Sequence, residues 1–372
     1  MDLVNSMTRK RVSVILPAYN ELENIKDVLR KLLEYECIYA LEIIVVDDDS
    51  IDGTANYVRE LARANDTVRP INRLGRNGLA SAIKEGLLNA TGDYAVDMDS
   101  DGQHEAKSVK DAINVLCEEK VDLVIGSRFH IDAEIDGLSE RREVASNLAN
   151  TFARLSLSKN YSHLSDYMTG FFAIRLSDSL AYIRRVEVNG FKFLYELLAV
   201  SHGRMSAMEI PLRFQGRVHG TSNLDIAILW DYFVSVVHNL SFRIIPRRAI
   251  SFAAVGISGV AIQFSLTSLL LSLASITFQQ ALPASVITAT TSNYIINNAL
   301  TFRSNRLRGK MLGTGLSKYM LVVSLPIIAN ISVSTTFYNL ITSNTYIAQL
   351  TGIAVAFAWN YLASSKFVWN SP

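Results

Sequence analysis

Apolar, β-branched runs alternate with amphipathic segments along the first part of the chain. The runs that predict strands are VSVILP from residue 12, EIIVVDDDS from 42, DYAVDMD from 93 and VDLVIGSR from 121. The segments that predict helices lie near 24–36, 54–65, 79–89 and 108–119. Because strands and helices alternate in this way, we expect an α/β domain with a mostly parallel sheet covered by helices. Ligands of such open sheets bind at the carboxyl ends of the strands.

Two later stretches, Ala249 to Phe302 and Tyr319 to Ser365, contain no Asp, Glu, Lys or Arg. Each stretch is long enough to cross a hydrocarbon core of about 30 Å twice as helix. We therefore expect an all-α domain with four transmembrane helices. Their expected bounds are about 249–273, 280–302, 318–341 and 345–367. A buried hairpin of a soluble domain would need polar outer faces on these helices, and the pattern provides none.

The net charge of +1 hides a separation of charge along the chain. All 35 acidic residues lie at or before Asp231, together with 27 basic residues, and nine basic residues follow. Basic residues precede the first expected span and fill the connection from Arg303 to Lys318, which places both on the cytoplasmic side. The start of the chain, MDLVNSMTRKR, lacks the features of a secretory signal. We therefore expect a multi-pass protein of the plasma membrane, with its first domain and both termini in the cytoplasm.

The two cysteines, Cys37 and Cys117, show neither metal-ligand nor disulfide spacing, so we expect packing residues in a reducing compartment. Between the two parts, apolar residues recur at helical spacing from Leu229 to Ile244. This pattern fits a helix lying on the membrane interface and fits equally a helix packed on the sheet. The expected division is a first domain at 1–225, a juxtamembrane helix at 226–246 and a membrane domain at 247–372.

Polar clusters follow the first two predicted strands: PAYNE at 17–21 and VVDDDSIDGT at 45–54. We interpret Asp49, Ser50 and Asp52 as turn and helix-capping residues, because Asp and Ser commonly take those roles after strands. Asp48 is the better candidate for a ligand-binding residue. Neither a GxGxxG turn after the first strand nor a GxxxxGK[ST] loop occurs, so dinucleotide and P-loop binding lose their main support.

The cluster MDSDGQH, residues 98–104, is the most informative of the chain. Asp99 and Asp101 point the same way at the end of a strand, and Gln103 follows in register. Oxygen ligands of this kind suit Mg²⁺ or Mn²⁺, which usually complete their coordination with substrate phosphates. A metal-bound diphosphate is therefore implied. We expect His104 to lie beside the ligands or to be exposed.

A basic group follows the next strand, where Arg128 ends the run IGSR. Arg142 and Ser146 stand four residues apart and would share one helix face, which suits an anionic phosphate. Arg217 lies on a glycine-flanked stretch that could close over a ligand. Without the acidic clusters, a solvated surface pair would be the preferred interpretation of Arg142 and Ser146.

The order of these motifs resembles glycosyltransferase family 2, and within it the polyprenyl-phosphate (dolichol-phosphate) mannosyltransferases. The resemblance covers roughly 12–224 and includes NRLGRNGLASAIKEGLLNATGDY, SDYMTGFFAIR and GRVHGTSNL. It implies a GT-A-type, Rossmann-like catalytic domain. The remaining part resembles a GtrA-like membrane domain through SNYIINNALTF, residues 292–302, and its echo WNYLASSKFVW, residues 359–369.

The resemblance implies a role for each residue that matches a family motif. The nucleotide sugar would be bound by Pro17, Tyr19, Glu21, Val46, Asp48, Asp99, Ser100, Asp101, Arg217 and Asn223. The metal, Mg²⁺ or Mn²⁺, would be held by Asp99, Asp101 and Gln103. The acceptor phosphate would be bound by Arg128, Arg142 and Ser146. Asp101 and Arg128 would act most directly in catalysis. Asn223 stands where the family has Lys, which removes a second cation from the diphosphate, and the family's GLG is GLA at 78–80.

The implied reaction is inverting, metal-dependent transfer of a single hexose, mannose from GDP-mannose, to a polyprenyl or dolichyl phosphate in the bilayer. A lipid phosphate is already an anionic nucleophile, so no general base is required. Transfer of glucose from UDP-glucose fits the same motifs. A lipid-linked sugar flippase with a regulatory soluble domain is the alternative from another class, and the intact Asp99, Asp101 and Gln103 favour the enzyme. A processive polysaccharide synthase would carry QxxRW, which is absent. No nucleic-acid partner is expected.

Overall fold

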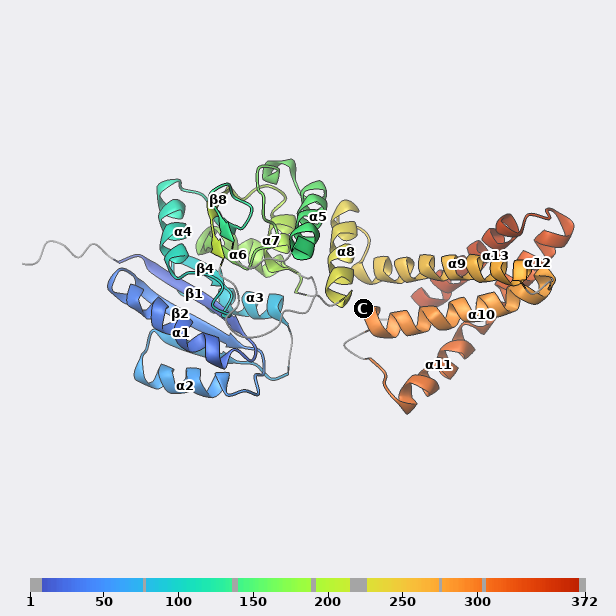
Figure 1. The fold of residues 1–372 in the computed structure, drawn as a ribbon, viewed down its shortest axis with the longest axis horizontal. Coiled ribbons are helices and arrows are strands. Elements are labelled where there is room, and N and C mark those ends of the chain that lie inside the picture. Colours follow the sequence, from blue (N-terminus) through green and yellow to red (C-terminus); the bar gives the residue numbers. More distant parts are fainter. Residues whose placement is uncertain are drawn as a thin grey trace, which may run out of the picture. The chain divides into compact units, whose positions relative to one another are not determined.

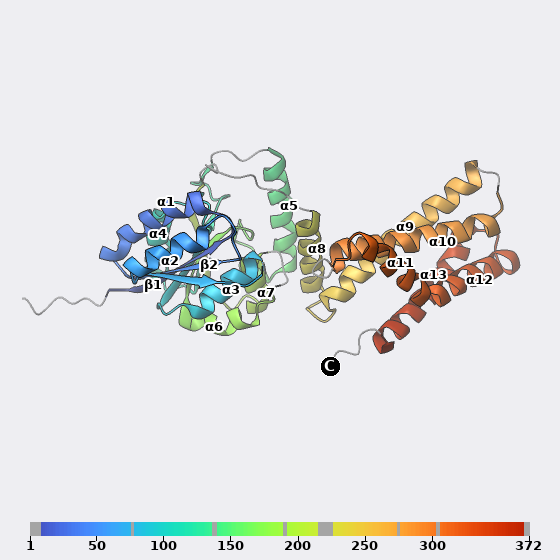
Figure 2. The same cartoon turned by 90° about the horizontal axis from the view of Figure 1, so that it is seen from below.

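The computed structural model describes residues 9–75, 78–135, 140–188, 192–214, 226–273, 276–302 and 306–367. The side chains of residues 135, 140–145, 214, 226–228 and 358–367 also lie outside the description. The chain divides into two compact units, Met1–Arg243 and Ile244–Pro372. Figures 1 and 2 show the elements of each unit from two directions.

A seven-stranded sheet with the order β3-β2-β1-β4-β7-β5-β8 forms the centre of the first unit. Its strands are β1 (Arg11–Ala18), β2 (Ala40–Asp47), β3 (Val68–Asn72), β4 (Tyr94–Met98), β5 (Leu123–Ser127), β7 (Phe171–Arg175) and β8 (Ala207–Pro211). Among these strands β7 is antiparallel to its neighbours β4 and β5, and the other pairs are parallel. The expected mostly parallel sheet is therefore confirmed. The strand order reverses between β1 and β4, where open sheets of this type form their ligand crevice.

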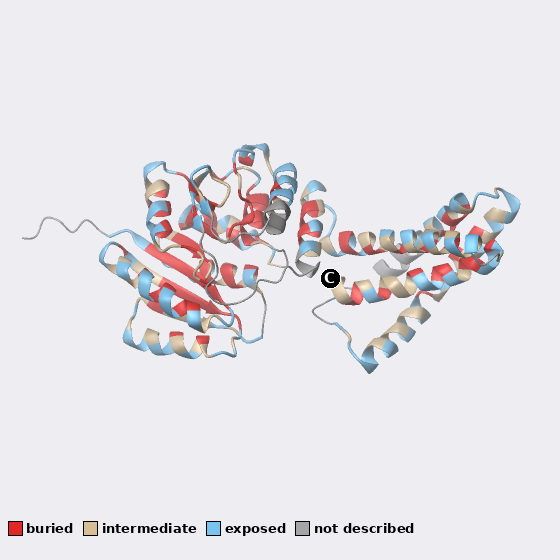
Figure 3. Ribbon diagram, viewed as in Figure 1, coloured by how far each residue is buried: buried red, intermediate tan, exposed pale blue. Residues whose placement is uncertain are grey.

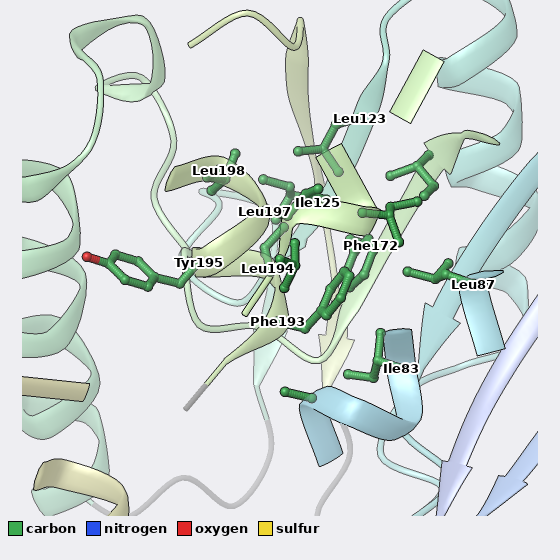
Figure 4. Packing of buried hydrophobic residues seen from close by; sticks show 14 of the residues in the cluster. Ile83, Leu87, Leu123, Ile125, Phe172, Phe193, Leu194, Tyr195, Leu197 and Leu198 are labelled. Atoms are coloured by element: carbon green, nitrogen blue, oxygen red, sulfur yellow. The ribbon is translucent and has the colours of Figure 1, made fainter. Parts of the chain in front are cut away.

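Two hydrophobic cores cover the faces of the sheet, because successive strand residues point to opposite sides. Val14 and Leu16 of β1 pack in one core with helices α1 (Leu22–Leu33), α2 (Thr54–Ala64) and α4 (Lys107–Glu118). Ile15 packs in the other core with helices α3 (Leu79–Asn89), α6 (Leu176–Arg185) and α7 (Phe193–Ser201). Figure 3 shows the buried sheet beneath helices with exposed outer faces, and Figure 4 shows the second core around Phe172 and Phe193.

Helix α8 (Ile226–Leu240) belongs to the first unit and packs on α5 (Glu140–Ser156). The hydroxyl of Tyr232 donates to the carbonyl of Ala149 at 2.5 Å, and its ring meets that of Tyr195 with the centroids 5.8 Å apart. Leu229 and Phe233, on the other face, are 50% and 47% exposed. One side of this helix therefore packs on the first unit, while the opposite side carries exposed apolar residues.

The second unit is helical. Its elements are α9 (Arg247–Leu273), α10 (Phe278–Ile296), the π-helical turn η3 (Asn297–Thr301), α11 (Lys310–Val322), α12 (Ser324–Leu340) and α13 (Thr345–Phe367). Within the described part of the chain, α9 is long and apolar enough to cross a membrane by itself, and α11 with α12 passes the same test as one bent pair. The helical character is confirmed, whereas four crossings remain a prediction.

The expected third span is not one helix. The structure has α11 and α12 in its place, bent by 53° at Val323. Pro326 gives the physical reason, because its ring would clash with the carbonyl of Val322 in a continuous helix and its nitrogen has no hydrogen to donate. The expectation of an unbroken helix at about 318–341 was therefore wrong.

Candidate active site

Apart from Arg142 and Ser146 on α5, the described candidate residues lie at or just after the carboxyl ends of β1, β2, β4 and β5, on both sides of the reversal in strand order. Two hydrogen bonds tie these loops together. The Ser100 hydroxyl, which is buried, donates to the carbonyl of Pro17 at 2.7 Å. The backbone N–H of Asp48 donates to the carbonyl of Ala18 at 2.9 Å. Strands that are far apart in sequence thus present their polar ends at one edge of the sheet.

Hydrogen bonds to Ser50 and Asp52 order the loop between β1 and α1. The backbone N–H of Asn20 donates to the Ser50 hydroxyl at 2.9 Å. Asp52 accepts from the backbone N–H groups of Leu22 and Thr54, both at 3.0 Å. Burial opposes the ionisation of Asp52, but a hydrogen bond from the Thr54 hydroxyl, together with these backbone hydrogen bonds, outweighs it and lowers the pKa of Asp52. The interpretation of Ser50 and Asp52 as turn residues is confirmed, and Asp49, with φ of +68°, also has a turn conformation. The expected capping role is wrong, because Gly53 is the N-cap residue of α2.

Asp48 is buried, and both of its carboxylate oxygens accept hydrogen bonds. Arg73 Nη1 donates to Oδ1 at 2.6 Å, and the backbone N–H of Gly78 donates to Oδ2 at 2.8 Å. Arg73 also donates to the Ser81 hydroxyl at 2.7 Å and lies 3.1 Å from the carboxylate of Glu85. Gly78 has φ of +90°, a conformation that favours glycine. The Asp48 carboxylate is thus held in a fixed orientation by an arginine that the sequence analysis did not single out.

The other predicted nucleotide-binding residues differ in how far they can be reached. Tyr19 is 36% exposed, and Glu21 is half-buried. Pro17 and Val46 are buried, and the Val46 side chain is part of the hydrophobic core. A nucleotide at this edge could therefore contact Val46 through its backbone alone. Arg217 and Asn223 lie outside the described residues.

Asp99 and Asp101 follow β4, as the sequence predicts. Asp101 is buried, and its Oδ1 accepts from the backbone N–H of Gln103 at 3.1 Å. The Asp99 side chain is 29% exposed, and its Oδ2 lies 3.6 Å from Nε2 of His104. His104 is buried beside Asp99, which confirms the first of its two expected placements and excludes an exposed one.

The donor set of two carboxylates and one amide suits a hard divalent cation that completes its coordination with diphosphate and water. No group of three or more histidine, cysteine, aspartate or glutamate side chains with metal-binding geometry occurs in the described part of the chain. Asp99, Asp101 and Gln103 remain the predicted ligands of this cation.

Asp97 lies in β4, two residues before Asp99, and is completely buried. Burial raises the pKa of its carboxyl group well above the ordinary range, and the neighbouring charge of Asp99 adds to this effect. Its two oxygens find no hydrogen-bond partner among the described residues. A carboxyl group whose protonated form is favoured by burial thus lies on the same strand, two residues before the candidate metal ligand Asp99.

Arg128 follows β5 and forms a bidentate pair with Asp166, a fully buried residue. Arg128 Nε donates to Asp166 Oδ2 at 2.7 Å, and Nη2 donates to Oδ1 at 3.0 Å. Burial alone would lower the pKa of Arg128, but the charge of Asp166, its hydrogen bonds and the charge of Asp99 together raise it. The candidate acceptor arginine therefore lies within electrostatic reach of the candidate metal ligand.

Asp166 belongs to the turn before β7, residues 165–170, which we call the β7 turn. Gly170 ends this turn against Asp99, and a Cβ atom on Gly170 would stand 2.1 Å from Asp99 Oδ2. The β7 turn thus touches the residues of both predicted substrate sites. The motif SDYMTGFFAIR contained these residues, but nothing in the local pattern identified their partners.

Ser146 lies in α5 and is half-buried. The side chain of Arg142, on the same helix, lies outside the described residues. The placement of both beside the acceptor phosphate stays a prediction.

Comparison with known proteins gives two family matches. Residues 13–179 match Glycosyl transferase family 2, and residues 251–369 match the GtrA/DPMS transmembrane domain. A dolichol-phosphate mannosyltransferase of Pyrococcus furiosus is 29% identical over 364 residues, which cover 96% of this chain and 99% of that protein. Its counterpart in Saccharomyces cerevisiae is 32% identical over 254 residues, covering 64% and 91%. The protein of the same name in Mycosarcoma maydis is 30% identical over 239 residues, covering 62% and 79%.

Among solved structures, glucosyl-3-phosphoglycerate synthase from Mycobacterium tuberculosis, crystallised with Mn²⁺, uridine diphosphate and glucosyl-3-phosphoglycerate, matches with a TM-score of 0.47. The two chains are 20% identical, and the match covers 63% of this chain and 81% of that one.

Proposed function

Because the chain is a glycosyltransferase that belongs to glycosyl transferase family 2 and carries a GtrA/DPMS transmembrane domain, we propose that it transfers one mannose from GDP-mannose to a dolichyl or other polyprenyl phosphate. The relatives in Pyrococcus, Saccharomyces and Mycosarcoma bear names that describe this product. The observation that carries the proposal is the β7 turn, which places Gly170 against Asp99 and pairs Asp166 with Arg128, because an anionic acceptor must approach an anionic donor there.

The donor is bound at the ends of β1, β2 and β4. Tyr19 and Glu21 offer an exposed ring and a carboxylate to the base and ribose, with the backbone of Pro17 and Val46 beside them. Asp48 accepts a ribose or base hydrogen bond with a carboxylate that Arg73 and Gly78 already orient. Arg217 approaches the diphosphate, where Asn223 supplies an amide instead of the family's lysine. Ser100 contributes to the donor site indirectly, because its hydroxyl holds the loop after β4 to the backbone of Pro17.

Asp99, Asp101 and Gln103 would hold Mg²⁺ or Mn²⁺ beside the donor diphosphate, and this cation would offset negative charge on the leaving group. Asp101, which is buried and hydrogen-bonded to the Gln103 backbone, keeps its position as that charge grows.

The acceptor phosphate is bound by Arg128, with Arg142 and Ser146 on α5. Their donors offset the repulsion between two anionic substrates and align the attacking oxygen. The phosphate oxygen is already ionised, so the site needs no proton acceptor. A single displacement then inverts the anomeric carbon.

The second unit anchors the enzyme where its lipid acceptor resides. We propose that its helices cross the plasma membrane four times, with α11 and α12 as one bent span and both termini in the cytoplasm. The lack of charge from Ala249 to Phe302 and from Tyr319 to Ser365 supports this arrangement. The exposed face of α8, with Leu229 and Phe233, lies on the membrane interface.

Membranes that contain the full-length protein test the function when they are incubated with radiolabelled GDP-mannose, UDP-glucose and other nucleotide sugars. We expect a lipid-extractable, acid-labile product from GDP-mannose, and no product with excess EDTA. Asp101→Asn should abolish the product, and membranes without the protein provide the background. If UDP-glucose alone gives a product, the transferred sugar is glucose and not mannose. If no donor gives a lipid-linked product, the transferase proposal fails and a flippase gains support.

A further inference from the structure

The β7 turn fixes the guanidinium of Arg128 from one side. Asp166 uses two of the five N–H donors of Arg128, those on Nε and Nη2, and its Oδ2 also lies 3.3 Å from the Arg128 backbone nitrogen. A bidentate pair of this kind fixes the plane of the guanidinium and its rotation within that plane. The Arg128 side chain is 15% exposed, and that of Asp166 is fully buried, so water screens the pair little.

A second carboxylate fixes the β7 turn itself. Glu209 of β8 accepts from the backbone N–H of Ser165 at 2.7 Å and from that of Asp166 at 3.1 Å. Its other oxygen accepts from the Ser165 hydroxyl at 2.8 Å. The Ser165 hydroxyl also lies 2.6 Å from that of Ser127, the residue before Arg128. The β7 turn is therefore held by β8 through Glu209 and by β5 through Ser127, and it holds Arg128 through Asp166.

This arrangement has a consequence for an arginine that binds phosphate. An unrestrained guanidinium would lose the freedom of four side-chain torsions each time an acceptor bound, and it could turn toward the nearby Asp99 carboxylate instead. Because Asp166 already orders the Arg128 side chain in the folded protein, acceptor binding does not have to order it. The same pair keeps the guanidinium from turning toward Asp99. The remaining three N–H donors of Arg128 then have one fixed direction.

We propose that Asp166 and Glu209 are positioning residues that act through Arg128 to bind the phosphate of the acceptor. The inference rests on the proposed function, because it takes Arg128 as the acceptor-binding residue. Neither carboxylate touches a substrate. Asp166 orients the guanidinium, and Glu209 orients the turn that carries Asp166.

The test compares steady-state constants of the purified full-length protein in detergent, with GDP-mannose as donor and a short-chain polyprenyl phosphate as acceptor. In Asp166→Asn the KM for the acceptor should rise about tenfold or more, while the KM for the donor stays within about twofold. In an Arg128→Lys background, where the bidentate pair is already lost, Asp166→Asn should change the acceptor KM by less than about twofold.

Glu209→Ala provides the second variant, because Glu209 is only half-buried on the edge strand β8 and its removal leaves the Arg128 pair in place. It should raise the acceptor KM about threefold. The matched control is Asp93→Asn, since Asp93 also forms a bidentate pair with an arginine, Arg11, but at the opposite end of β4. We expect both of its KM values to equal those of the wild type.

Three outcomes would overturn the inference: an unchanged acceptor KM in Asp166→Asn, an equal rise of both KM values, or an undiminished effect in the Arg128→Lys background. Thermal melting identifies variants that do not fold, and Glu209→Ala decides the question if Asp166→Asn is among them. A wild-type protein that makes no lipid-linked product contradicts the proposed function instead.

Discussion

At the scale of single residues, Asp97 has an unusual environment for an aspartate. Its carboxyl group is completely buried in β4 and has a raised pKa, so the folded protein keeps it protonated where an exposed aspartate is ionised. The unfolded chain releases this proton above the ordinary pKa of about 3.9. Folding must therefore take up a proton, and the stability that Asp97 contributes is full below about pH 4 and declines as pH rises toward the folded pKa.

Asp97→Asn removes this dependence, because an amide has the same shape and no proton to take up. We expect the stability of the variant relative to the wild type to rise as the pH increases above about 4, with a slope of up to about 1.4 kcal/mol per pH unit until the folded pKa is reached. Denaturant unfolding of both purified proteins at a series of pH values measures the difference between their free energies of unfolding. Asp93→Asn is the control. Arg11 lowers the pKa of Asp93, so this substitution should change the pH dependence of stability only at acidic pH. A pH-independent difference for Asp97→Asn would contradict a protonated Asp97.

The sequence identified the candidate residues that depend on local position, and it missed those that depend on distant partners. Asp48, Asp99 and Asp101 follow predicted strands, and parallel strands bring their ends together whatever the rest of the fold does. The pairs of Asp48 with Arg73 and of Arg128 with Asp166 span 25 and 38 residues. No local periodicity encodes such pairs, so they required the structure.

At the scale of elements, the sequence predicted the strands β1, β2, β4 and β5 and the helices between them. It did not predict β3, in which VRPIN is short, contains proline and is only partly buried. It also did not predict β7, although FFAIR is almost completely buried. A strand buried on both faces shows no period-two alternation and is recognised by its β-branched residues, as β5 was, whereas FFAIR contains only one, Ile174.

Helix α3 packs on the sheet through Gly86. A Cβ atom there would lie 2.5 Å from Ile15 Cγ2 and 3.2 Å from Val46 Cγ2, both of them core atoms. We expect Gly86→Ala to lower the free energy of unfolding by about 1–3 kcal/mol, because overpacking outweighs the better helix propensity of alanine. Denaturant titration of the full-length protein measures the change. Gly313→Ala in α11, where nothing lies within 4 Å of the new Cβ, is the control and should not destabilise. A Gly86→Ala protein as stable as the wild type would show that α3 can move away from β1.

At the scale of the whole molecule, the charge distribution agrees with the division into two units. The acidic residues end at Asp231, within the last helix of the first unit, and the second unit contains basic residues and no acidic ones. The composition revealed this boundary because a chain that enters a bilayer must exclude charge over long stretches. Composition does not show where the helices of the second unit bend, because single residues such as Pro326 determine those positions.

The proposed topology makes the Arg303 to Lys318 connection cytoplasmic and the short connection at 342–346 external. Single cysteines at Ser304 and Ser343, in a chain with Cys37→Ser and Cys117→Ser, test it by labelling of intact cells. An impermeant maleimide should label Ser343→Cys directly, and Ser304→Cys only after permeabilisation, because basic loops stay inside. Labelling of Ser304→Cys from outside would exclude the four-crossing arrangement.

The β7 turn also matters for how such enzymes can be recombined. It presses Gly170 against Asp99 on the donor side and pairs Asp166 with Arg128 on the acceptor side, although it lies far from both in sequence. A chimaera that takes its donor-binding segment from one family member and its acceptor-binding segment from another places a junction within these contacts. Successful swaps of sugar specificity should therefore carry the β7 turn along with the segment after β4, so that one parent supplies the whole interface.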